Sequence, residues 1–157
     1  MGRFAKYYEE SVHLTLPPEE VFNFIDDHAK FSEHMNKPSL MLGKGKMEVV
    51  FDDSHGRAVG SHIRLTGNAF GIKIYLDEMI TRYEPPLVKI WETVGDLQLL
   101  VIGRYEMGFE IKPMENGSHL RVFIDYDPPK NFVILEKLFG KIYAKWCVRQ
   151  MLKSLPQ

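Results

Sequence analysis

The sequence has a single cysteine, Cys147, and it has neither a long apolar run nor an excess of charge of one sign. One cysteine rules out a disulfide within the chain and leaves a CxxC redox or zinc motif without its second thiol. The longest apolar run, LQLLVIG at 97–103, is much shorter than the roughly 20 residues that a membrane-spanning helix needs. The start of the chain also lacks the apolar segment of a signal peptide. These absences predict a cytoplasmic protein without stable insertion into a membrane.

The charges are balanced. Lys and Arg number 20 and Asp and Glu number 21, so the formal net charge is -1. Such a chain has no overall field that would attract nucleic acid or an anionic membrane. The segment RYEMGF at 104–109 carries aromatic residues but lacks the pattern of an RNA-recognition strand, and Glu106 and Glu110 would repel phosphate. We therefore expect no nucleic-acid partner.

The sequence motifs of metal and nucleotide chemistry are also missing. The six histidines form neither HExxH nor another spacing that places two metal ligands on one element. There is no GxSxG elbow and no GxGxxG turn, and GKGK at 43–46 lacks the spacing and the final Ser or Thr of a P-loop. The sequence therefore predicts neither a metal site nor a cofactor.

Length and composition favour one domain over residues 1–157. With 45 % hydrophobic residues, a chain of this size can bury a core large enough to enclose a cavity. Between Lys46 and Tyr126, strand-like segments rich in β-branched and aromatic residues are separated by the short sequences DSHG, EPP, GD and ENG. Connections this short make consecutive strands antiparallel neighbours, so we expect an antiparallel meander.

Helices are expected on both sides of this meander in the sequence. A first strand within 4–16 runs into a helix that begins at Pro18 and has acidic residues in its first turn. A second short helix, carrying Phe31 and Met35, should follow, and a long helix over 135–155 closes the chain. The expected buried stripe of the first helix comprises Val21, Phe22, Phe24 and Ile25.

Alternation along two strands predicts a sheet with one charged and one apolar face. In 103–112, Arg104, Glu106, Glu110 and Lys112 share one side. In 118–126, Arg121 and Asp125 share the side opposite the apolar residues. An apolar sheet face needs a cover, and the terminal helix is the only long amphipathic element. The predicted apolar face comprises Tyr105, Met107, Phe109, Ile111, Leu120, Val122, Ile124 and Tyr126.

The terminal helix is apolar on two sides, more than one core contact requires. Small residues let one side approach the sheet closely, and we expect that side to be Gly140, Ala144, Cys147, Val148, Met151 and Leu155. The second side could pack on the short helices, cover the mouth of a cavity, or form a dimer contact. It comprises Leu135, Leu138, Phe139, Ile142 and Trp146. A slanted row of Lys137, Lys141, Lys145, Arg149 and Lys153 should face solvent.

Three stretches of the chain together resemble the START-like or SRPBCC superfamily (Bet v 1-like), in particular its polyketide cyclase/dehydrase-like branch. They are SVHLTLPPEEVFNFIDD at 11–27, MITRYEPPLVKIWETVG at 79–95 and RVFIDYDPPKNFVILEKLFGKIYAKWCVRQMLKSL at 121–155. The resemblance covers nearly the whole chain. It implies the α+β helix-grip fold: a curved antiparallel sheet wrapped around a long C-terminal helix, with two short helices after the first strand. It also implies a cavity for a hydrophobic or amphipathic small molecule between the sheet and the helix.

The function predicted from these observations is binding of a hydrophobic small molecule or lipid, for storage, transport or sensing. Apolar walls would supply most of the affinity at about 25 cal/mol per Å² of buried surface, and a few polar groups would orient the ligand. Methionine side chains suit an adaptable pocket. The predicted lining is Phe24, Met35, Met79, Trp91, Tyr105, Met107, Phe109, Val122, Ile124, Phe139, Ile142 and Trp146.

Two alternatives remain. An enzyme of the polyketide cyclase or dehydratase type would need an acid or base facing the cavity, with a pKa shifted toward working pH by desolvation. The candidates are Asp77, Tyr105 and Tyr126, each of which has an ordinary structural explanation as well. The other alternative is a homodimer that uses the aromatic face of the terminal helix and has no useful cavity.

Overall fold

The computed structural model describes residues 3–27, 47–69, 71–99, 102–129, 133–153 and 155. Its elements are β1 (Lys6–Leu14), α1 (Pro18–Ile25), β2 (Met47–Phe51), β3 (His62–Ala69), β4 (Ile72–Glu84), β5 (Val88–Gln98), β6 (Tyr105–Met114), β7 (Gly117–Tyr126) and α3 (Val133–Lys153). The strands form one seven-stranded sheet in the order β1-β7-β6-β5-β4-β3-β2. Every neighbouring pair is antiparallel, as the short connections predicted.

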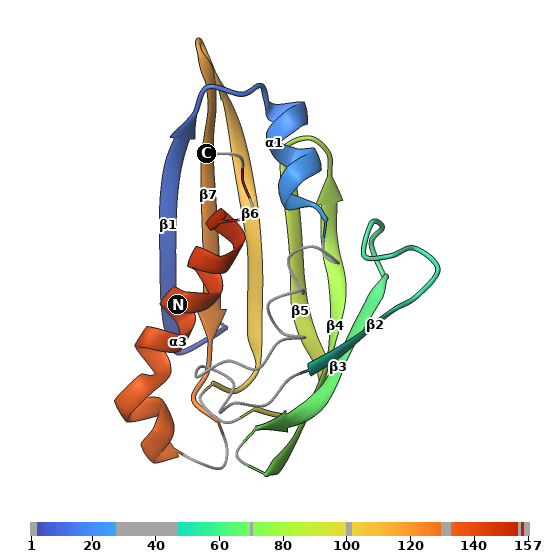
Figure 1. Ribbon diagram of the computed structural model, residues 1–157, viewed down its shortest axis with the longest axis vertical. Helices are drawn as coiled ribbons and strands as arrows, with labels where there is room; N and C mark the ends of the chain where they lie inside the picture. The colour runs from blue at the N-terminus through green and yellow to red at the C-terminus, as the bar shows by residue number, and fades with distance from the viewer. Residues whose placement is uncertain are drawn as a thin grey trace.

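The sheet is curved, and helices α1 and α3 lie on its concave side (Figure 1). Helix α3 packs against β1 and β7, whereas α1 contacts β6 and β7. Strand β1 pairs with β7, so the first strand in the sequence lies next to the last in the sheet. This α+β arrangement confirms the predicted helix-grip fold. None of the helices in the described ranges combines the length and apolar character that crossing a membrane requires.

Helix α1 begins where the sequence predicted. Pro18 occupies its first turn, where a missing N–H costs nothing, and Glu19 and Glu20 lie at the positive end of the helix dipole. Val21, Phe22 and Ile25 are buried as expected. The ring of Phe22 meets Tyr83 and Phe109 edge to face, at centroid distances of 5.7 and 5.5 Å. The second short helix, expected around Phe31 and Met35, falls outside the described residues.

The alternation predicted for β6 and β7 is confirmed. Tyr105, Met107 and Phe109 are buried in the concave side, and their direct partners on β7 are Tyr126, Ile124 and Val122. Strand β5 continues the row, because Trp91 pairs with Met107. Aligned side chains of this kind form a continuous apolar floor across β5, β6 and β7. That floor is the concave face on which a ligand site was predicted.

Strand β4 contains an irregularity that alternation alone does not reveal. Its register with β5 shifts between Ile80 and Arg82, so that Thr81 is an extra residue. Before the shift, the even-numbered side chains face the core, including the buried Glu78 and Ile80. After it, Tyr83 packs against the core instead. Asp77 and Tyr83 are both odd-numbered, yet Tyr83 points inward and Asp77 points outward because the shift lies between them.

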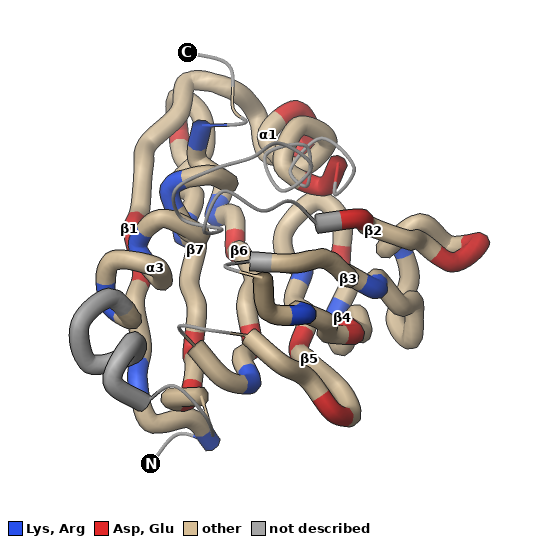
Figure 2. Tube along the Cα trace, turned by 60° about the horizontal axis from the view of Figure 1, so that its bottom comes forward, with Lys and Arg blue, Asp and Glu red and all other residues tan. Residues whose placement is uncertain are grey.

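The described part of α3 packs on the sheet through its predicted side. Ala144, Cys147, Val148 and Met151 are buried, as is Leu155 after the helix. On the opposite side Lys141, Lys145, Arg149 and Lys153 are exposed, as predicted for the basic row. Figure 2 shows basic residues on the described part of α3 and residues of both signs on the strands. Within this row, Arg149 pairs with Glu10 of β1 at 3.2 Å, at the exposed surface.

Candidate interior binding site

Two clusters of polar side chains interrupt the apolar concave face. Glu78, Asp26 and Lys89 are each at most 6 % exposed. Ionisable groups are almost never fully buried unless they are paired, and perturbed ones gather at functional sites. None of these three residues was predicted from the sequence to belong to a site. The only available signal was the position of Glu78 within an otherwise apolar alternation, Ile74, Leu76, Ile80, on β4.

The first cluster, called the Glu78 cluster, consists of Glu78, Trp91 and Tyr105. These residues come from three adjacent strands, β4, β5 and β6. The hydroxyl of Tyr105 donates a hydrogen bond to Oε2 of Glu78. The indole N–H of Trp91 hydrogen-bonds the same carboxyl group. Thr93 lies directly opposite Glu78 on β5. Its hydroxyl oxygen accepts a hydrogen bond from the backbone N–H of Tyr105 at 3.2 Å, which holds the backbone of Tyr105 in position.

Burial controls the protonation of this cluster. Loss of water raises the pKa of Glu78 to about 7, and the hydrogen bonds from Tyr105 and Trp91 and the charge of Lys89 limit that rise. Burial and the neighbouring Glu78 hold the pKa of Tyr105 well above its ordinary value, so the phenol keeps its proton. A carboxyl group that titrates near neutral pH beside a phenol is suited to orienting a ligand or to transferring a proton.

Helix α3 brings Tyr143 and Cys147 to the Glu78 cluster. The two side chains are hydrogen-bonded to each other, and both act electrostatically on Tyr105. Burial raises the pKa of the Cys147 thiol to about 12. The thiolate is the reactive form of cysteine, so this thiol is a poor nucleophile at neutral pH. Cys147 therefore contributes packing to the interior rather than covalent chemistry.

The second cluster, called the Asp26 cluster, consists of Asp26, Arg57, Tyr83 and Lys89. The Asp26 carboxylate accepts hydrogen bonds from Nζ of Lys89 and from the hydroxyl of Tyr83, both at 2.6 Å. Arg57, from the β2–β3 connection, approaches the same carboxylate to 3.6 Å. Burial lowers the pKa of Lys89, and Asp26 opposes that change. Because its members satisfy one another, the Asp26 cluster ties the end of α1 to the sheet.

Six of the twelve predicted lining residues lie on the concave face of the sheet. These side chains are buried together on β5, β6 and β7, and two of them, Trp91 and Tyr105, belong to the Glu78 cluster. Tyr126, one of the catalytic candidates, lies directly opposite Tyr105. The described residues that the structure places here are Trp91, Tyr105, Met107, Phe109, Val122, Ile124 and Tyr126.

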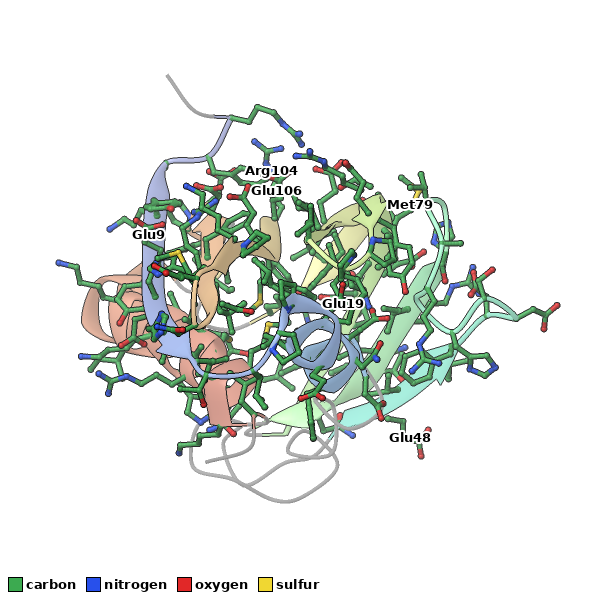
Figure 3. All side chains as sticks on the ribbon, turned by 90° about the horizontal axis from the view of Figure 1, so that it is seen from above. Glu9, Glu19, Glu48, Met79, Arg104 and Glu106 are labelled. Atoms are coloured by element: carbon green, nitrogen blue, oxygen red, sulfur yellow. The ribbon has the colours of Figure 1, made fainter. Side chains whose placement is uncertain are left out.

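Four predicted residues lie elsewhere and are corrected here. Asp77 and Met79 project from the outer face of β4, as Figure 3 shows for Met79, and Asp77 is paired there with His62 at 2.9 Å. Phe24 is 38 % exposed because it lies on the outer side of α1, where it lines an open surface hollow of about 310 Å³. Ile142 is 56 % exposed on α3.

The other residues predicted for the site or for the second side of the terminal helix are either partly buried or outside the described residues. Trp146 is partly buried against the core, and its ring centroid lies 5.6 Å from that of Tyr143. Met35 lies outside the described residues, and so do the side chains of Leu135, Leu138 and Phe139. Within the described ranges, no group of three His, Cys, Asp or Glu side chains could hold a metal ion.

Comparisons with known proteins identify the fold. No protein-family model matches the chain, and no curated protein matches it in sequence. Protein TTHA0849 from Thermus thermophilus has a similar structure, with a TM-score of 0.65 and 17 % identity over 95 % of this chain and 93 % of that one. Ara h 8.0201, a Bet v 1 allergen, has a TM-score of 0.53 and 15 % identity over 94 % and 98 % of the two chains.

A third similar structure is the Polyketide_cyc-like protein Cgl2372 from Corynebacterium glutamicum. It has a TM-score of 0.51 and 16 % identity over 94 % of this chain and 81 % of that one. At these identities the likeness concerns the fold. The resemblance predicted from the sequence, to Bet v 1-like and polyketide cyclase-like proteins, is therefore confirmed at the level of the fold.

Proposed function

We propose that the chain binds a hydrophobic or amphipathic small molecule against the concave face of its sheet. The observation that carries this proposal is the Glu78 cluster, a hydrogen-bonded acid on an apolar floor. Ligand sites are mostly apolar surfaces with a few convergent polar groups, and the concave face has that composition. The buried aromatic and methionine side chains around Glu78 would supply the affinity, and the cluster would orient the ligand.

Binding can be tested with the uncharged dye N-phenyl-1-naphthylamine, whose fluorescence rises in apolar surroundings. We expect saturable enhancement by the native protein and none by the protein unfolded in guanidinium. The chain offers a matched pair of variants, because Met107 is 3 % exposed on the concave face and Met79 lies on the outer face. Met107→Ala should change the dye affinity several-fold, as expected from a few buried methylene-sized groups.

Met79→Ala should leave the dye affinity unchanged, and circular dichroism should show that both variants fold. Equal effects of the two variants would contradict a site on the concave face. Native mass spectrometry of the gently purified protein supplies an independent measurement, because a small molecule retained from the cell would appear as a discrete mass increment.

A second candidate function is acid–base catalysis of the cyclase or dehydratase type. It is favoured by the pKa of about 7 that burial gives Glu78 beside the phenol of Tyr105. Conversion of a synthetic poly-β-ketone to an aromatic ring can be followed by ultraviolet absorbance. An enzyme that used Glu78 should lose about 10²-fold or more of its rate in Glu78→Gln, whereas Glu115→Gln in the exposed β6–β7 turn should not. If the native protein showed no turnover, the catalytic function would be contradicted and the binding function would remain.

The dimerising alternative has less support from the described residues. Of the face proposed for it, Ile142 is exposed, but Trp146 packs against the core of its own chain. Single exposed apolar residues are common on monomeric proteins. Light scattering at micromolar concentration would detect a dimer, and Ile142→Glu should abolish it if α3 forms the contact.

A further inference from the structure

The hydrogen-bond capacity of the Glu78 cluster indicates what kind of ligand it can accept. A carboxylate offers about four acceptor positions. The described residues fill two of them, through the hydroxyl of Tyr105 and the indole N–H of Trp91. Tyr105 has only one proton, and it is given to Glu78, so the phenol oxygen can only accept further hydrogen bonds. Counting the described residues alone, the ionised cluster therefore presents acceptors to a ligand and no remaining donor.

The charges around Glu78 disfavour an anionic ligand. The groups that influence it are Tyr105 on β6, Lys89 on β5, Asp77 on its own strand, and Tyr143 and Cys147 on α3, where Glu78 contributes to their pKa shifts. Lys89 is the cation among them, and its ammonium is bound by Asp26 at 2.6 Å. A ligand carboxylate beside Glu78 would place two negative charges together in a desolvated site, which is costly.

The titration of Glu78 narrows the choice further. Because burial raises its pKa to about 7, both the acid and the carboxylate are populated near neutral pH. A ketone can only accept, and so it matches only the protonated form. A hydroxyl can donate to the carboxylate or accept from the acid, so it matches both forms. Trp91 and Met107, which are 1 % and 3 % exposed, provide apolar contacts for the rest of the molecule.

We propose that the Glu78 cluster is the specificity-determining part of the interior site and that it selects an uncharged apolar alcohol or phenol over a carboxylate. This inference rests on the proposed binding function. It assigns recognition of the ligand hydroxyl to Glu78, with Tyr105 and Trp91 holding the carboxyl group in position. The apolar floor binds the body of the ligand without distinguishing its polar group.

Three probes with the same ring system test the proposal: naphthalene, 2-naphthol and 2-naphthoate, each competing with N-phenyl-1-naphthylamine at pH 7. We expect 2-naphthol to bind about tenfold more tightly than naphthalene, because it adds a hydrogen bond to a charged or polarised group. We expect 2-naphthoate to bind more weakly than naphthalene. Lowering the pH from 8.5 to 5.5 should strengthen 2-naphthoate binding relative to naphthalene, because Glu78 becomes neutral.

Glu78→Gln gives the decisive variant. In this variant Tyr105 and Trp91 can still donate hydrogen bonds to the oxygen of the new side-chain amide, which leaves the amide N–H groups facing the ligand. The binding preference should then shift from 2-naphthol toward 2-naphthoate by about tenfold or more. Glu106→Gln, on the outer face of β6, is the matched control and should keep the native preference (Figure 3). Thermal melting establishes that both variants fold, and the pH comparison on the native protein needs no variant.

The outcomes separate the two proposals. Dye binding with equal competition by all three probes at both pH values would overturn the specificity assigned to Glu78 and leave the binding function intact. The same conclusion follows if a folded Glu78→Gln variant keeps the native preference. Failure of the dye and of all three probes to bind would overturn the proposed function and this inference together.

Discussion

The ammonium of Lys89 lies 2.6 Å from the carboxylate of Asp26, and the lysine side chain is completely buried. Asp26 caps the end of α1, whereas Lys89 is on the concave side of β5. A helix of eight residues is too short to be stable by itself, so its position depends on packing and on contacts such as this one. The ion pair therefore holds α1 in place over the concave face.

Loss of the Asp26 carboxylate should be strongly destabilising. Asp26→Asn leaves the buried Lys89 without its carboxylate, and breaking a buried pair from one side typically costs about 3–5 kcal/mol. Urea unfolding followed by circular dichroism measures the change in the free energy of unfolding. Glu84→Gln is the control, because the Arg82–Glu84 pair is exposed and should contribute no measurable stability.

Replacing both members of the pair should restore part of that loss. In Asp26→Asn with Lys89→Met, the buried charge is gone and an apolar side chain of similar length fills its place. We expect the double variant to be more stable than Asp26→Asn alone, which gives a positive coupling energy in a double-mutant cycle. Strictly additive losses would show that the two residues do not act as a pair.

Stability should fall as the pH rises through the titration of Glu78. Its pKa is about 7 in the folded protein and 4.5 as the ordinary value, so the folded state binds the proton more tightly than the unfolded state. The free energy of unfolding should therefore decrease between about pH 4.5 and pH 7, by on the order of 3 kcal/mol from this group. Glu78→Gln should remove this component, measured as the difference between variant and native curves from urea titrations.

The same titrations with Glu115→Gln, in the exposed β6–β7 turn, provide the reference, and this variant should follow the native curve. If the Glu78→Gln curve stayed parallel to the native one from pH 4.5 to pH 7, the assignment of a raised pKa to Glu78 would be incorrect.

Gly117, at the start of β7, should not tolerate a side chain. Its φ is +143°, and an added Cβ would collide with the backbone carbonyl oxygen of Leu14 at the end of β1. Gly71 also has a positive φ, +75°, but an added Cβ there meets nothing within 4 Å. Gly71→Ala should therefore cost only backbone strain of about 1 kcal/mol. Gly117→Ala should cost clearly more, measured by thermal unfolding, and equal losses would contradict the close approach of β1 and β7.

Cys147 should react slowly while α3 is packed on the sheet. The residue is 6 % exposed, and burial raises its pKa to about 12, so the thiolate fraction at pH 8 is on the order of one in ten thousand. Modification by Ellman's reagent at pH 8 should be slow in the native protein and fast in guanidinium. Labelling of the native protein at the rate of a free thiol would show that α3 does not stay docked.

The fold could be predicted from the sequence because its signals are local. Alternation identified the apolar side of β6 and β7, and the Pro18 signal identified the start of α1. Local patterns did not reveal the register shift at Thr81, which depends on how β4 pairs with β5. Beyond that shift the inward positions change, so Tyr83 faces the core although Asp77, at the same alternation, faces outward. Alternation predicts that Glu78 lies on the same side as Ile74, Leu76 and Ile80. Only the tertiary structure shows that this side of β4 faces the core.

The sequence by itself determined the class of the protein, the order of its elements and the apolar side of its last two strands, because these follow from the spacing of side chains along a regular backbone. Tertiary structure alone decided which polar groups meet. Glu78 and Tyr105 are 27 residues apart, and Asp26 and Lys89 are 63 apart, so only the pairing of strands and the docking of α1 bring them together. Their burial in that arrangement gives Glu78 its raised pKa and makes the concave face a candidate ligand site.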